Sequence, residues 1–77
     1  MKVIDMRTEP DDVDISVSPS QATSLHEIYR EVRAASMLIA SAEPDVLIDL
    51  GENSDGMPQA DIYRDGSLVR RVFATFD

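Results

Sequence analysis

The chain has 77 residues, of which 15 are acidic and 7 are basic, and its formal net charge at pH 7 is −8. A charge of this size repels nucleic acid and anionic membranes and attracts basic surfaces, so we expect no direct nucleic-acid or membrane partner. The chain has no cysteine, which excludes disulfides and thiolate metal sites.

The length predicts one compact domain that spans residues 1–77, with a small core. No apolar run approaches the ~18 residues of a membrane span. Asp5 and Glu9 lie where a signal peptide would need its apolar stretch. We therefore expect a cytoplasmic protein.

Two short strands are predicted before the first helix. The apolar residues of segment 1–7 favour a strand, and the turn-forming segment 8–12 follows it. In segment 13–17, three apolar residues alternate with Asp14 and Ser16. This pattern is typical of a half-buried strand that turns its acid and hydroxyl toward water, so we expect a hairpin.

A long amphipathic helix is predicted next. Ser18 fits the N-cap, Pro19 fits the first helical position, and Gln21 lies three residues after the cap. Pro44 predicts a helix end near Ala42, because the residue before a proline avoids helical angles. Spacings of three and four predict one buried stripe. Its members are Leu25, Ile28, Tyr29, Val32, Ser36 and Ile39.

The second half of this helix, residues 34–42, contains no charge. Met37 and Leu38 point away from the predicted stripe. A helix that is apolar on every side needs cover on every side. Either loops and a strand edge cover this end, or another subunit does.

Three further strands are predicted after the helix. Residues 46–50 are almost all apolar, and a polar segment rich in turn formers follows. Segments 60–64 and 67–76 are joined by Asp65-Gly66, which is a strong hairpin signal. The expected fold class is therefore α+β: a single small domain with one long helix on an antiparallel sheet of four or five strands, in the order ββαβββ.

The last hairpin predicts a pairing register and two apolar faces. A two-residue turn would pair Tyr63 with Leu68, Ile62 with Val69, and Asp61 with Arg70. Alternation would then place Ile62, Val69 and Phe73 on one face, and Tyr63, Leu68, Val72 and Phe76 on the other. One helix can cover only one of them, so we expect the other face to associate. The predicted oligomer interface consists of Met37, Leu38, Tyr63, Leu68 and Val72.

The densest group of acids lies in segment 9–14. It could coordinate a cation, imitate a row of phosphates, or be a solvated turn that keeps the protein soluble. Together with acids of the later loop it predicts a partner-binding surface. The residues assigned to that surface are Asp11, Asp12, Asp14, Glu52 and Asp55.

No pattern in the sequence indicates catalysis. His26 is the only histidine and has no predicted catalytic partner, and neither a nucleophile motif nor a phosphate-binding glycine loop is present. The loop at 51–58 is rich in oxygen donors, but EF-hand spacing would put Gly51 and Ile62 at ligand positions. We therefore expect no enzyme, no catalytic residues, no cofactor and no metal.

Two functions remain open. The first is a small acidic, non-enzymatic protein that occupies a basic surface on a partner protein. By analogy of class alone, such proteins are frequent among phage and mobile-element inhibitors, including anti-CRISPR proteins and nucleic-acid mimics. The second is a homo-oligomeric structural or accessory protein, possible as a homodimer, that buries its free sheet face and the second half of its helix.

Overall fold

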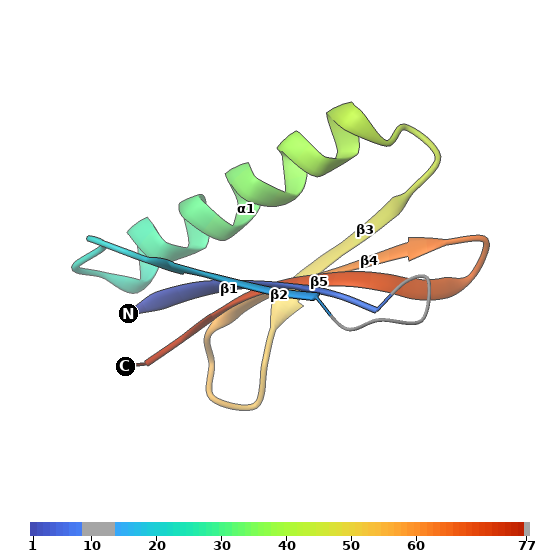
Figure 1. Cartoon of the computed structure of the whole chain (residues 1–77). Coiled ribbons are helices and arrows are strands. Elements are labelled where there is room, and N and C mark those ends of the chain that lie inside the picture. Colours follow the sequence, from blue (N-terminus) through green and yellow to red (C-terminus); the bar gives the residue numbers. More distant parts are fainter. Residues whose placement is uncertain (9–13, 77) are drawn as a thin grey trace.

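The computed structural model describes residues 1–8 and 14–76, and within them one helix lies across one face of a five-stranded antiparallel sheet (Figure 1). This confirms the α+β class and the order ββαβββ. The elements are β1 (Lys2–Arg7), β2 (Asp14–Pro19), α1 (Leu25–Ala42), β3 (Leu47–Glu52), β4 (Pro58–Arg64) and β5 (Ser67–Thr75).

The strand order in the sheet is β2-β1-β5-β4-β3. The first and last strands of the chain therefore pair at the centre, and β2 and β3 are the two edges. α1 packs on β3, β4 and β5. A helix about 10 Å wide covers two or three strands spaced ~4.8 Å apart, so β2 lies outside its reach.

The helix begins six residues later than the sequence predicted. Ser24 is the N-cap, and its side-chain oxygen accepts a hydrogen bond from the backbone N–H of Glu27. The carboxylate of Glu27 accepts bonds from the N–H and the hydroxyl of Thr23, the residue before the cap, so the reciprocal bond of a capping box is made one position earlier than usual. Ser18 and Pro19 instead belong to β2, where Pro19 is paired with Lys2 of β1.

The core lies between α1 and the covered face of the sheet. Ile28, Val32 and Ile39 supply the helix side, and the hydroxyl of buried Ser36 donates to the carbonyl of Arg33 at 2.8 Å. Of the other two members of the predicted stripe, Leu25 is largely exposed and Tyr29 is half-buried. The sheet side consists of Met57, Ala60, Ile62, Val69, Val72 and Ala74.

The hairpin between β4 and β5 has the predicted turn but a different register. Asp65 and Gly66 both have positive φ, 52° and 81°, as a type I′ turn requires. The register shifts after the pair of Tyr63 with Leu68, so that Asp61 lies opposite Arg71 and not Arg70. The extra residue is a β-bulge.

The bulge also corrects the assignment of faces. Val72 pairs with Ala60, faces the helix and is 1% exposed. It is a core residue, so its assignment to the oligomer interface was wrong. Phe73 stands on the uncovered face instead, since it pairs with Ile4 and alternates with Val72.

Candidate binding surface

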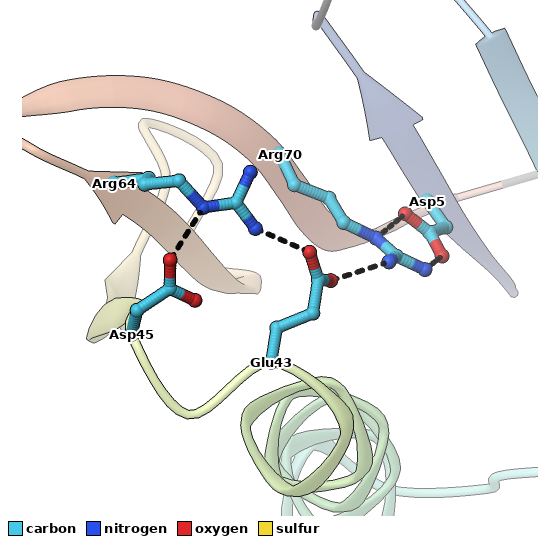
Figure 2. A network of polar contacts seen from close by, with 5 residues as sticks. All are labelled: Asp5, Glu43, Asp45, Arg64 and Arg70. Carbon is cyan, nitrogen blue, oxygen red and sulfur yellow. Dashed lines mark hydrogen bonds and ion pairs between the residues drawn. The ribbon is translucent and has the colours of Figure 1, made fainter.

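A network of ion pairs joins the end of the helix to the sheet (Figure 2). Arg70 binds Asp5 through two nitrogens, with Nε 2.7 Å from Oδ1 and Nη2 2.5 Å from Oδ2. The carboxylate of Glu43, the residue that caps α1, lies between Arg70 and Arg64 and contacts both. Arg64 also bonds to Asp45, which fixes the loop between α1 and β3.

Ion pairing keeps two arginines charged. The hydrogen bond that Arg70 donates to Asp5 raises the pKa of Arg70, against a smaller opposing effect of burial. Outside the network, the hydrogen bond that Arg71 donates to Asp61 raises the pKa of Arg71 in the same way. Because the folded pKa is raised, the stabilisation is fully present at every pH below the ordinary pKa of arginine and is lost only as the pH rises through the higher folded pKa. These arginines are paired with acids of the protein itself and offer little positive charge to a partner.

Two hollows beside this network are polar. One, of about 80 Å³, is lined by Arg7, Glu43, Arg70 and two core residues. The other, of about 260 Å³, is lined by Asp5, Arg7, Asp14, Ser16 and Arg70. Ligand sites for organic molecules usually measure roughly 300–1,000 Å³ and are mostly apolar, so neither hollow has the size and lining of such a site. Within residues 1–8 and 14–76, no three His, Asp or Glu side chains gather closely enough to hold a metal ion.

The face of the sheet away from α1 carries a continuous apolar area. Ile4 of β1 lies directly between Val17 of β2 and Phe73 of β5, and Met6 lies beside Ile15. Cross-strand partners share a face, and the alternate residue Val3 packs on the core on the other side. The five residues that form this area, here called the sheet patch, are Ile4, Met6, Ile15, Val17 and Phe73.

The sheet patch is exposed most at its outer strand. Ile15 is 55% exposed and Val17 is 54% exposed. The sequence predicted a half-buried strand with Asp14 and Ser16 facing water. Asp14 and Ser16 are exposed as predicted, but Ile15 and Val17 are exposed as well. The reason is that Ile15 and Val17 lie on the face opposite α1, and one helix covers only one face of the sheet.

A polar band separates the sheet patch from a second apolar corner. Arg71 bonds to Asp61 at 2.7 Å, and the side chain of Gln59 also donates to Asp61. Asp49, on β3, lies opposite Asp61. Beyond this band, a row of three apolar residues crosses the sheet. Its members are Leu68, Tyr63 and Leu47, paired in that order.

The predicted acidic surface is not gathered in one place among the described residues. Asp14 begins β2, at the corner where Arg7 ends β1. Glu52 ends β3 on the opposite edge, beside Pro58 at the other end of the strands, and Asp55 follows it in the loop. The two groups therefore occupy diagonal corners of the sheet. Asp11 and Asp12 lie outside the described residues.

The predicted oligomer interface is likewise divided. Tyr63 and Leu68 are neighbours on the uncovered sheet face. Met37 and Leu38 are exposed on α1, which is on the other side of the sheet, and Leu38 is 72% exposed. A single flat contact cannot include both pairs.

None of the five residues of the sheet patch was predicted from the sequence to lie on an exposed face. The strand around Ile15 and Val17 was predicted, but its apolar side was assigned to the core. The available signal was the single helix, because one helix can cover only one face of a sheet. The Asp5–Arg70 pair was also missed, and no short-range pattern links residues 65 positions apart.

No protein-family model matches this chain, and neither a curated protein nor a solved structure is significantly similar to it. In the part of the chain that the structure describes, the helix is not long and apolar enough to cross a membrane. The chain's own geometry therefore carries the functional argument.

Proposed function

We propose that the protein is a small, acidic, non-enzymatic binding module that occupies a basic and apolar surface on a partner protein. One observation supports this most: the helix covers one face of the sheet, and the other face presents the sheet patch to solvent. Contiguous exposed apolar areas on small proteins commonly mark interaction sites.

The net charge of −8 favours a partner whose contact surface is positively charged. It attracts a basic surface over a distance and discourages acidic ones, while apolar contact supplies most of the binding free energy. An inhibitor of the phage or mobile-element type, such as an anti-CRISPR protein, acts by occupying a surface in this way. The diagonal separation of Asp14 from Glu52 gives less support to mimicry of a phosphate row, which needs aligned acids.

A displayed library of random peptides tests this proposal. Selected peptides should combine basic and apolar residues, and their binding should weaken as salt is raised. The double variant I15T/V17T removes apolar area and keeps β-branched side chains, so the fold should survive. We expect it to lower affinity about tenfold or more, in line with the loss of two half-exposed aliphatic contacts.

L38Q is the matched control for this experiment, because it removes an exposed aliphatic side chain from the helix. It should leave peptide affinity unchanged. Peptides that lose affinity with L38Q, or that keep full affinity for I15T/V17T, would refute the sheet patch as the contact surface.

A second candidate function, the homo-oligomeric accessory protein, is favoured by a different observation. Met37 and Leu38 form an exposed apolar pair on the outer side of α1. A second copy packed there would remove both side chains from water.

A further inference from the structure

β2 is an edge strand whose inner hydrogen bonds can be assigned. The N–H of Ser20 donates to the carbonyl of Met1 at 2.9 Å, just beyond the last pair of the β1–β2 ladder. In an antiparallel ladder every second pair exchanges hydrogen bonds. By this alternation, Ser18, Ser16 and Asp14 bond inward to β1.

Ile15 and Val17 therefore direct their backbone N–H and C=O groups outward, away from β1. No described strand lies on that side, since β2 is the end of the sheet. Edge strands with unpaired backbone groups accept a further strand unless a charge, a bulge or a proline blocks them. The only such blocking residues in β2 are the charged Asp14 at its first end and Pro19 at its last.

The two sides of β2 differ in chemistry. Ile15 and Val17 lie on the side of the sheet patch, and Asp14, Ser16 and Ser18 lie on the other. An added strand must therefore alternate apolar residues with small polar ones to match both sides. β2 itself has this pattern, so a second copy of β2 fits the requirement.

We propose that two copies of this chain associate through their β2 edges, antiparallel, about a twofold axis at Ser16. Each Ile15 then exchanges both backbone hydrogen bonds with Val17 of the second copy. The two sheets become continuous, and the two sheet patches join. An axis at Val17 would be poorer, because it sets each Ile15 carbonyl opposite Pro19, which has no N–H.

The charges agree with this arrangement. Asp14 is the one charged residue of β2 and lies at its first end, so that end is the acidic one. Antiparallel pairing moves the acidic ends of the two copies apart and sets each near the end where Pro19 pairs with Lys2. Asp14 itself comes to lie opposite the neutral Ser18.

The net charge of −8 on each copy opposes association, so added salt should strengthen it. This sign is opposite to that expected for a basic partner on the sheet patch. The proposed dimer does not rest on the proposed function. The sign of the salt dependence shows which of the two has failed, because salt should strengthen the dimer and weaken binding to a basic partner.

A single engineered cysteine tests the axis directly. The two Ser16 residues would form a non-hydrogen-bonded pair with Cα atoms about 4.5 Å apart, within the range that a disulfide spans. In the same register the two Ser18 residues are about 14 Å apart along the strands. Because the natural chain has no cysteine, S16C and S18C each offer one possible bond.

Under mild oxidation we expect S16C to form a covalent dimer at least about tenfold faster than S18C, and faster in high salt than in low salt. Equal rates for the two variants would overturn the proposal. A rate for S16C that falls with salt would also count against it.

The variant V17P provides the second arm, in the S16C background. Proline removes an outward N–H that β1 does not use, and edge strands tolerate it. The fold, followed by circular dichroism, should persist while cross-linking falls to the S18C rate.

E52P is the matched control on the other edge of the sheet. The bond from the N–H of Asn53 to the carbonyl of Met57 shows that the backbone N–H of Glu52 points outward, away from β4. Cross-linking should stay rapid in the E52P variant. Cross-linking that stays rapid in V17P would refute pairing through the β2 edge.

Discussion

At the scale of single residues, Ser24 determines where the helix begins. Its side chain satisfies an N–H of the first turn that has no partner within the helix. Removing such a cap costs about 1 kcal/mol. We therefore expect S24A to lower the free energy of unfolding by about 1 kcal/mol in urea titrations.

The control is S18A, at the position that the sequence favoured as the cap. Ser18 is exposed in β2 and caps nothing, so S18A should change stability by less than about 0.5 kcal/mol. A larger loss in S18A than in S24A would show that the helix starts at the earlier serine.

The two serines also show what the sequence could not decide. Each has Gln or Glu three residues later, and Pro19 suits both a first helical position and the end of an edge strand. The choice is made by pairing, since Lys2 lies opposite Pro19 and Met1 accepts from Ser20. Those contacts join residues far apart in sequence, and local patterns do not contain them.

At the scale of elements, the ion pairs of Figure 2 fasten the end of α1 to the sheet. Arg70 is the centre, because it binds Asp5 of β1 and contacts Glu43 at the cap of α1. Breaking a partly buried pair of this kind leaves carboxylates without their cation and costs roughly 1–3 kcal/mol. We expect R70Q to lower the free energy of unfolding by that amount.

R30Q is the matched control for R70Q, because Arg30 is exposed on the helix and its loss changes the net charge equally. Its effect on unfolding should stay below about 0.5 kcal/mol. Similar losses in the two variants would mean that overall charge, and not the Arg70 network, accounts for the effect.

The strands and the turn of this region were predictable, but the register was not. Asp65-Gly66 specifies a tight turn, and Tyr63 pairs with Leu68 as predicted. Arg70 and Arg71 are adjacent and chemically equal, so the sequence could not show which one Asp61 would meet. The bulge lets Arg70 join Val69 on the helix side, where Asp5 and Glu43 lie, and leaves Arg71 to Asp61.

At the scale of the whole molecule, the fold class followed from the order of periodic segments, and the binding surface did not. The sheet has two faces and the single helix covers one of them, so the apolar residues of the other face form the sheet patch. Acids counted along the sequence suggested a charged surface, yet Asp5, Glu43 and Asp61 are bound by arginines. The net charge of a sequence does not show where in the fold the charged residues lie or which of them are paired.

The symmetry of the proposed dimer makes a prediction about larger assemblies. An interface about a twofold axis closes on itself, so the β2 edges alone give dimers and nothing larger. Growth beyond a dimer needs another surface, and the second candidate function assigns it to Met37 and Leu38. L38E should therefore reduce any larger assembly to dimers in sedimentation experiments up to about 1 mM.

Since Leu38 is 72% exposed, the free energy of unfolding of L38E should stay within about 0.5 kcal/mol of the parent's. Monomers in L38E would move the dimer contact from β2 to the helix, and larger assemblies that persist in L38E would eliminate the helix as the second surface.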